Sequence, residues 1–351
     1  MGGGGGGGGG RLREGDWGWG VGGGGGGCLG GGSGFFRAIR AICGQGGRLH
    51  YGIDAAREWG YRQAMKRYPA VKEKVAVVTG ASTGIGRATA RMLKSRGWRV
   101  FPTARNRTDL DLLRGEGFQP VELDLADPDS VEYAAKEVLE LSQGVLGAVV
   151  NNAGYGQPGA LEDLSRSAMR KQFEANVFGT LDFTNRFIPL FRAQQSGRIV
   201  LVSSVVGRVV IPLMGAYCAS KFALEAIGDE LRMELGPAGI SVSLVEPGPI
   251  KTNFRKRTVS EAARGLEMRD SAFAAYYAKE LTEPERTYSR PTDIFRKPPE
   301  AVAAKIAHAL ESRWPHARYP VTGAAWFGEF AARFLPARLK DRILAKAAIK
   351  K

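Results

Sequence analysis

The feature that constrains the fold most is an apolar strand followed by a glycine turn and a helix, at residues 75–96. Residues 75–79 read Val-Ala-Val-Val-Thr, which is typical of a buried strand of a parallel sheet. The turn Gly-Ala-Ser-Thr-Gly-Ile-Gly follows at residues 80–86, and a helical stretch then runs to Gly97. Glycines let a backbone approach a pyrophosphate, and a helix N-terminus offers N–H donors. The stretch predicts a dinucleotide-binding unit, although its spacing is G-x-x-x-G-x-G and not G-x-G-x-x-G.

The alternation of strand and helix continues along the chain. Further strands are predicted at residues 99–103, 120–123, 146–150, 197–202, 239–245 and 318–321. Helices are predicted at residues 127–141, 164–193, 217–235 and 300–312. This rhythm predicts an α/β fold, a Rossmann-type doubly wound parallel sheet in three layers. Ligands of such sheets bind beyond the carboxyl ends of the strands, so we expect the functional residues there.

The end of the second strand carries the signal for cofactor choice. In a Rossmann unit the residue at this place meets the adenosine ribose, and an acidic side chain there would bind the 2′-hydroxyl of NAD. Here the position is Ala104, followed by Arg105 and then by Arg107. A guanidinium suits a 2′-phosphate because its planar donors are charged. The sequence therefore predicts NADP (NADPH) rather than NAD, with an ordinary surface arginine as the alternative.

A tyrosine and a lysine stand four residues apart in Tyr217-Cys218-Ala219-Ser220-Lys221. On a helix this spacing places both side chains on one face, about 6 Å apart between Cβ atoms. A lysine cation beside a phenol favours the phenolate and would lower the tyrosine pKa from about 10. Such a tyrosine can exchange a proton with an alcohol or a carbonyl near neutral pH. Alone, the spacing is common by chance, and the plain alternative is a solvated helix face.

Other motifs fall at strand ends or on the following helices. They are Asn151-Asn152-Ala153-Gly154, Asn176, Ser204 and Pro247-Gly248. Together with the glycine turn, Tyr217 and Lys221, they resemble the short-chain dehydrogenase/reductase family over residues 74–252. The resemblance implies an NAD(P)-dependent oxidoreductase that is a homo-oligomer, dimeric or tetrameric. Residues beyond Thr252 are the variable part of that family, where substrate choice lies.

The resemblance implies a role for each matched residue. Tyr217 would be the general acid/base, and Lys221 would lower its pKa and bind the nicotinamide ribose. Ser204 would hold the substrate oxygen, and Asn176 would hold a water in a proton relay. The residues expected at the cofactor are Gly80, Ser82, Thr83, Gly84, Ile85, Gly86, Arg105, Asp124, Leu125, Asn152, Ala153, Gly154, Tyr217, Lys221, Pro247, Gly248, Ile250 and Thr252. The three histidines are scattered without ligand spacing, so no metal is expected.

The expected substrate is a hydrophobic alcohol or carbonyl compound. Tyr155-Gly156, the long insertion at residues 253–299 and the aromatic C-terminal part resemble the branch of 17β-hydroxysteroid and retinol dehydrogenases. That likeness implies a steroid, a retinoid or a lipid-like aldehyde. The alternative functions are a non-catalytic NADP-binding regulatory protein and a membrane-surface accessory protein. The intact Ser204, Tyr217 and Lys221 disfavour the first of these.

Charge and cysteine content limit the partners. The formal net charge is +15, which raises nucleic acids and anionic membranes as partners. Much of the excess lies in the tails, because residues 1–70 hold nine Lys and Arg against four Asp and Glu, and residues 313–351 hold nine against two. No nucleic-acid-binding signature accompanies it, so no such partner is expected. Three cysteines without C-x-x-C spacing, and the lack of a long apolar run, indicate a cytoplasmic protein.

Three regions are expected along the chain. Residues 1–70 should be a disordered glycine-rich tail, either a linker or an RNA-binding arm, and the favoured interpretation places it upstream of a true start at Met65. Residues 74–323 should form one Rossmann domain that includes a substrate-binding insertion at residues 253–299. Residues 324–351 alternate aromatic and basic side chains in an amphipathic pattern. This pattern fits peripheral membrane contact, or a hydrophobic wall or partner contact that covers the substrate pocket.

Overall fold

The structure, a computed structural model, describes Met1 and residues 67–254, 258, 271–275, 277–278 and 296–348. The tail predicted at residues 1–70 therefore lies almost wholly outside the described residues, as does Met65. Most of the insertion predicted at residues 253–299 also lies outside them.

A seven-stranded parallel sheet forms the centre of the domain, in the order β3-β2-β1-β4-β5-β6-β7. The strands are β1 (Val75–Val78), β2 (Arg99–Ala104), β3 (Val121–Glu122), β4 (Ala148–Asn151), β5 (Gly197–Val202), β6 (Ile240–Glu246) and β7 (Arg318–Pro320). The strand order reverses between β1 and β4, and such a switch point is where open α/β sheets bind ligands. The predicted doubly wound Rossmann-type sheet is confirmed.

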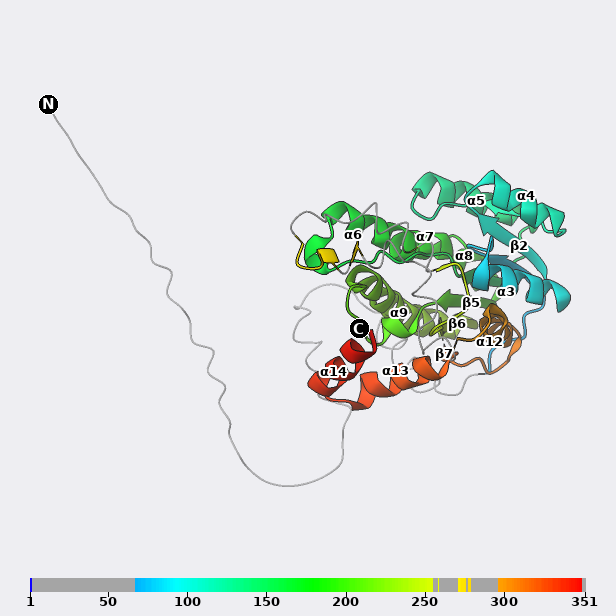
Figure 1. Cartoon of the computed structure of the whole chain (residues 1–351). Coiled ribbons are helices and arrows are strands. Elements are labelled where there is room, and N and C mark those ends of the chain that lie inside the picture. Colours follow the sequence, from blue (N-terminus) through cyan, green and yellow to red (C-terminus); the bar gives the residue numbers. More distant parts are fainter. Residues whose placement is uncertain (2–66, 255–257, 259–270, 276, 279–295, 349–351) are drawn as a thin grey trace, which may run out of the picture. The chain divides into compact units, whose positions relative to one another are not determined.

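Helices cover both faces of this sheet (Figure 1). One face carries α3 (Gly84–Ser95), α4 (Arg107–Gly115) and α12 (Pro299–Glu311). The other face carries α5 (Pro128–Leu141), α7 (Gly179–Asn185), α8 (Ile188–Gln194) and α9 (Gly215–Leu235). The remaining elements are η1 (Leu161–Asp163), α6 (Arg166–Phe173), η2 (Glu174–Phe178), η3 (Val205–Gly207), η4 (Gly236–Ala238), α13 (Gly323–Phe334) and α14 (Ala337–Ala348). The three layers expected from the sequence are therefore present.

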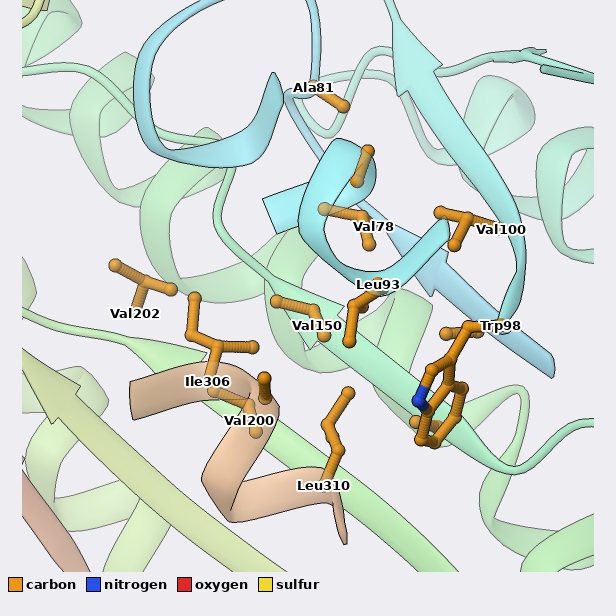
Figure 2. Close-up of a cluster of buried hydrophobic side chains, with 14 of the residues drawn as sticks. Val78, Ala81, Leu93, Trp98, Val100, Val150, Val200, Val202, Ile306 and Leu310 are labelled. Atoms are coloured by element: carbon orange, nitrogen blue, oxygen red, sulfur yellow. The ribbon is translucent and has the colours of Figure 1, made fainter. Parts of the chain in front are cut away.

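Two hydrophobic cores lie between these layers. Successive strand side chains point to opposite faces, so Val78 of β1 joins one core and Val77 joins the other. The first core packs β1, β2, β4 and β5 against Leu93 of α3 and Ile306 of α12 (Figure 2). Full burial of each such side chain contributes about 1.5–3 kcal/mol. The cores fix the carboxyl edge of the sheet, where the polar motifs lie.

The single helix predicted over residues 164–193 is wrong. The structure divides this stretch into α6, the π-helical η2, α7 and α8. A π-helical turn interrupts a regular helix and is frequent at functional sites. Asn176 lies within η2, where its side chain bonds to a neighbouring loop. Pro189 lies in the first turn of α8, a position that tolerates the missing N–H of proline.

The C-terminal segment also divides into two helices. The helices α13 and α14 are separated by Leu335 and Pro336. Pro336 has no N–H to continue the α13 hydrogen-bond ladder, so α14 begins after it. Among the helices that the structure describes, none is long and apolar enough to cross a bilayer.

Candidate active site

Tyr217 and Lys221 lie on the buried side of α9, in its first and second turns. The tyrosine is 9% exposed and the lysine 4% exposed. The Lys221 ammonium donates to the carbonyl oxygen of Val202, at the end of β5, over 2.8 Å. Its Nζ lies 5.8 Å from the centroid of the Tyr217 ring. The pair therefore faces the carboxyl edge of the sheet and not solvent.

The protonation of this pair differs from the expectation. Burial raises the pKa of the Tyr217 phenol above its ordinary value, and a hydrogen bond with Ser204 opposes the rise. Burial lowers the pKa of Lys221 to about 8, against the attraction of Glu225 one turn later. The expected lowering of the Tyr217 pKa by Lys221 is therefore wrong for this structure. Loss of hydration at the phenol outweighs the charge of an ammonium that is itself bound to a carbonyl.

Ser204 joins three elements beside the phenol. It follows β5 and is the N-cap residue of η3, where its Oγ accepts from the Val206 N–H over 3.3 Å. Its hydroxyl lies 3.4 Å from the carbonyl oxygen of Pro247, which follows β6. Ser204 also forms a hydrogen bond with the Tyr217 phenol of α9. Two hydroxyl groups therefore meet where a substrate oxygen can be held and protonated.

Asn176 fixes the loop that follows β4. Its Nδ2 donates to the Tyr155 carbonyl over 2.9 Å, and its Oδ1 accepts from the Tyr155 N–H over 3.1 Å. The same Nδ2 also donates to Ser220 Oγ over 3.2 Å. A Cβ on Gly154 would lie 3.0 Å from Asn176 Oδ1. Asn176 thus ties the Gly154 loop to the residue that precedes Lys221 on α9.

Apolar side chains surround the Tyr217 ring. Val206 and Cys218 are buried against it, with Ile211 and Met214 partly buried at the same cluster. The ring of Phe254 lies 5.4 Å from the Tyr217 ring, centroid to centroid. Among the described residues, the surroundings of the phenol are therefore apolar apart from Ser204 and Lys221.

The glycine turn after β1 has the backbone that its glycines predict. Gly80 and Gly84 have φ values of +64° and +57°, a region that L side chains disfavour. A Cβ on Gly86 would lie 2.4 Å from the Gly80 carbonyl and 2.6 Å from Asn152 Nδ2. Asn152 in turn donates to the Gly80 carbonyl over 3.1 Å. The turn is therefore closely packed, and Asn152, which follows β4, fixes its backbone by a hydrogen bond.

Thr79 is a structural residue of this turn for which the sequence predicted no separate role. Its Oγ1 accepts from the backbone N–H groups of both Asn152 and Ala153, each over 3.0 Å. The hydroxyl is fully buried and joins the ends of β1 and β4. A threonine at the end of an apolar strand was visible in the sequence, but its partners lie more than seventy residues away along the chain.

The N-terminus of α3 fits an anionic group. Thr83 is its N-cap residue, yet the threonine side chain makes no capping bond and the first turn holds no acidic side chain. In α4, by contrast, the Asn106 side chain accepts from the Asp109 N–H over 2.8 Å. Uncapped N–H groups at a helix start suit a phosphate, and glycines let the backbone approach it. The residues present therefore fit the pyrophosphate of a dinucleotide.

The other predicted cofactor residues lie along the same edge of the sheet. Arg105 is exposed directly after β2, and none of the described residues pairs with it. Asp124 follows β3, and its carboxylate accepts from the Ala126 N–H over 3.0 Å. Gly84 and Thr252 approach each other, since a Cβ on the glycine would lie 3.1 Å from Thr252 Cγ2.

Other residues predicted to bind the cofactor are buried beneath the carboxyl edge of the sheet or pack closely against it. Leu125 is buried in the second core, and Ser82 is 8% exposed in the glycine turn. Ile85 and Ile250 pack against the first core. Gly248 closely approaches Thr322, because a Cβ there would lie 2.1 Å from Thr322 Oγ1.

Sequence reasoning missed a buried charged cluster behind Lys221. Arg318 of β7 pairs through Nε with Glu225 and Glu246, each over 3.2 Å, and through Nη2 with Asp229 over 2.6 Å. Glu225 and Glu246 are 3% and 1% exposed. Burial, followed by the charge of Glu225, raises the pKa of Glu246 to about 8. These residues come from α9, β6 and β7, so only the folded sheet brings them together.

The described part of the insertion is fastened beside the start of α9. The Tyr277 hydroxyl donates to Asp163 Oδ2 over 2.5 Å and accepts from the Ala160 N–H over 2.8 Å. Ser271 donates to the same carboxylate oxygen over 2.7 Å. The neighbouring Gly159 forms a bridge with Met214, directly before α9. The insertion therefore has an anchor next to the apolar cluster.

Comparison with known proteins agrees with this geometry. The family profile described as short chain dehydrogenase matches residues 74–263. An uncharacterized oxidoreductase of Escherichia coli, YbbO, is 40% identical over 274 residues, which cover 78% of this chain and 95% of the relative. Retinol dehydrogenase 5 of Homo sapiens is 33% identical over 276 residues, covering 76% of this chain and 86% of the relative.

Solved structures of similar proteins contain both forms of the nicotinamide cofactor. A short chain dehydrogenase from Burkholderia cenocepacia in complex with NADP matches with a TM-score of 0.61 at 26% identity, over 79% of this chain and all of the other. A short chain dehydrogenase/reductase from Burkholderia phymatum in complex with NAD matches with a TM-score of 0.60 at 26% identity, over 72% of this chain and 90% of the other.

Proposed function

The chain belongs to the short chain dehydrogenase family and is an oxidoreductase, and we propose that it interconverts an alcohol and a carbonyl group on a hydrophobic substrate with NADP. One observation carries the proposal: the buried Tyr217 phenol meets the Ser204 hydroxyl at the carboxyl edge of the sheet. The glycine turn and the uncapped α3 N-terminus lie at the same edge. A proton donor and a dinucleotide site therefore face one region.

The chemistry divides between cofactor and protein. The bound nicotinamide supplies or accepts the hydride. In the direction of reduction, Ser204 holds the substrate oxygen and Tyr217 gives that oxygen its proton. Burial raises the pKa of Tyr217, so the phenol is protonated at neutral pH and holds the proton that the substrate oxygen receives. Lys221 adds a buried cation beside the phenol and, by the family likeness, binds the ribose, while Asn176 belongs to the proton relay behind it.

The proposed substrate class rests on the surroundings of the phenol. Ile211, Met214 and Phe254 place apolar surface beside the reacting hydroxyls. Burial of substrate apolar surface there contributes about 25 cal/mol per Å². The likeness to retinol dehydrogenase 5 supports the same class, which comprises steroids, retinoids and lipid-like aldehydes.

The NADP preference rests on Arg105. Its exposed guanidinium lies at the end of β2, where a dinucleotide's adenosine ribose would lie. A charge-assisted bond to a 2′-phosphate contributes about 1.5–3 kcal/mol. We expect Arg105→Ala to raise the KM for NADPH about 10- to 100-fold and to leave the KM for NADH unchanged. Arg99→Ala, at the opposite end of β2, is the control, and an unchanged NADPH/NADH ratio in Arg105→Ala would remove the phosphate contact.

The alternative of a non-catalytic NADP-binding protein is less well supported. A protein that only binds NADP does not require a serine, a tyrosine and a lysine that converge on one point. The proposal also keeps the organisation expected from the sequence, a cytoplasmic homo-oligomer whose catalytic domain spans residues 74–323. Light scattering on the purified full chain tests the oligomeric state.

Turnover by the purified protein tests the proposed function. NADPH is mixed with a panel of steroid, retinoid and long-chain carbonyl compounds, and the fall in NADPH absorbance is followed. We expect consumption with at least one apolar carbonyl and its loss in Tyr217→Phe. Tyr133→Phe, an exposed tyrosine on α5, is the matched control and should keep the wild-type rate. Equal consumption by wild type and Tyr217→Phe would refute the assigned site.

A further inference from the structure

The helix α13 presents its aromatic side chains to solvent. Trp326, Phe327, Phe330 and Phe334 are 63%, 43%, 52% and 64% exposed, and we call them the aromatic face. Positions 326, 330 and 334 are four residues apart, so these side chains share one side of the helix, and the Phe330 and Phe334 rings lie 5.2 Å apart. An exposed group of large apolar side chains marks a contact surface more often than single ones do.

The opposite side of α13 is built from small residues. Ala325, Gly328 and Ala331 are buried. A Cβ on Gly328 would lie 2.4 Å from Val205 Cγ2, so the helix backbone packs directly on η3. The ion pair between Glu329 and Arg208, at 2.7 Å, also holds the helix in this rotation. The aromatic face therefore points away from the site, and a hydrophobic wall made of these four rings over the substrate pocket is excluded.

Cations accompany the aromatic face. Arg333 lies in the last turn of α13, with its guanidinium 5.9 Å from the centroid of the Phe334 ring. Arg338, Lys340 and Arg342 follow on α14, and Asp341 is the acidic residue among them. In the part of the chain that the structure describes, none of the four cations forms an ion pair. The surface therefore combines exposed aromatic rings with uncompensated positive charge.

Leu339 and Ile343 extend the apolar surface onto α14. They are 47% and 37% exposed and four residues apart, on one side of that helix. The two helices follow each other at the margin of the domain, and neither is long and apolar enough to span a bilayer (Figure 1). Aromatic rings with flanking Arg and Lys are typical of a helix that lies in the interface of a membrane.

We propose that the aromatic face, together with Arg333, Arg338, Lys340 and Arg342, docks on the surface of an anionic lipid bilayer. Charge complementarity favours this occupant over a second copy of the chain. A two-fold dimer through this face would bring the same four cations of each copy together. An anionic leaflet instead attracts each cation by about 1 kcal/mol, and the rings add apolar burial. This inference does not depend on the proposed reaction.

Vesicle flotation of the full-length protein tests the proposal. Vesicles of phosphatidylcholine alone are compared with vesicles that contain one quarter phosphatidylglycerol. We expect the protein to float with the anionic vesicles and at least about tenfold less with the neutral ones. Trp326 fluorescence should shift to the blue on binding, because the indole leaves water.

Two pairs of variants separate the contributions. Phe330→Ser with Phe334→Ser should lower the affinity for anionic vesicles at least about tenfold, whereas Tyr133→Ser, at an even more exposed ring on α5, should not. Arg338→Gln with Arg342→Gln should weaken binding about 10- to 30-fold, as two lost charges imply, and should reduce its salt dependence. Thermal unfolding of each variant shows that it is folded.

Two results would overturn the lipid assignment. One is equal flotation of the wild type and the Phe330→Ser, Phe334→Ser variant. The other is a concentration-dependent dimer that this variant abolishes while the wild type ignores anionic vesicles, since a second copy would then occupy the face.

Discussion

The helices α9 and α13 bury opposite kinds of side chain. α9 encloses Tyr217, Lys221 and Glu225, which are 9%, 4% and 3% exposed. α13 exposes Trp326 and Phe334 by more than half and buries Ala325, Gly328 and Ala331. Each helix contains a local inversion of the ordinary order of burial, because charged side chains lie inside on α9 and large aromatic rings lie outside on α13. Such inversions are unfavourable for stability, and they locate the proposed chemistry on α9 and the proposed contact surface on α13.

The largest effect is expected at the buried cation of α9. Lys221→Met should lower turnover about 10²–10⁴-fold, because a group beside the proton donor is removed. The same change should raise the free energy of unfolding by about 1–3 kcal/mol at pH 7, because burial lowers the pKa of Lys221 to about 8. Turnover and thermal unfolding are measured on the same preparations.

The pH dependence of this gain has a definite sign. Below pH 8 the folded protein holds the ammonium against its loss of hydration, and that penalty disappears as the pH rises from about 8 towards the ordinary value of 10.5. The stability gain of Lys221→Met should therefore be largest below pH 8 and shrink above it. Lys136→Met, on the exposed side of α5, is the control. A Lys221→Met protein less stable than wild type at pH 7 would show that the buried cation stabilises the fold.

The next effect concerns how α13 is attached. Gly328→Ala would place a methyl group 2.4 Å from Val205 Cγ2, so we expect a loss of about 1–3 kcal/mol in the free energy of unfolding. Gly323→Ala, at the start of the same helix, meets no atom within 4 Å and should be neutral. Denaturant unfolding compares the two. If both variants unfold alike, α13 does not pack on η3 through its small residues.

A pH-dependent effect is expected from the carboxyl groups behind Lys221. The pKa of Glu246 is raised to about 8, so the folded state favours the protonated form. Its contribution to stability is complete below the ordinary value of 4.5 and is lost as the pH rises through 8. Glu246→Gln should reduce the fall in the free energy of unfolding between pH 4.5 and pH 8. Glu234→Gln, exposed on α9, should leave the wild-type slope, and an unchanged slope in Glu246→Gln would contradict the shift.

The smallest effect is expected at the aromatic face. Phe330→Ser with Phe334→Ser should change the free energy of unfolding by no more than about 0.5 kcal/mol per residue, since both rings are exposed. Phe183→Ala, fully buried on α7, should lose about 3–5 kcal/mol. Thermal unfolding gives the comparison. A large loss in the double variant would mean that the rings stabilise the fold itself.

The sequence predicts the sheet well because its strands have a local signature. The runs at β1, β4, β5 and β6 are apolar and β-branched, as buried parallel strands require, and the glycine turn has backbone angles that glycine favours. The break of the predicted 164–193 helix had a local signal at Pro189, but the π-helical turn that contains Asn176 had none. Asn176 there bonds to Tyr155, a tertiary contact.

The sequence predicted which residues form the candidate site, but it did not predict how deeply they are buried or which charged groups surround them. The spacing of Tyr217 and Lys221 predicts a shared face, yet it cannot show how strongly burial raises the pKa of the phenol. The cluster of Glu225, Glu246 and Arg318 depends on the pairing of β6 with β7. The outward face of α13 was visible as an amphipathic pattern, but the side that packs inward was decided by Gly328 against Val205.

The central claim is that Tyr217 on α9 supplies the proton of the reaction. Its most direct test is single-turnover oxidation of bound NADPH by an apolar carbonyl compound, in wild type and Tyr217→Phe, with NADPH affinity measured separately. We predict NADPH affinities within about threefold of each other and a rate of oxidation that falls about 10²–10⁴-fold in the variant. Equal single-turnover rates at equal NADPH occupancy would contradict the claim.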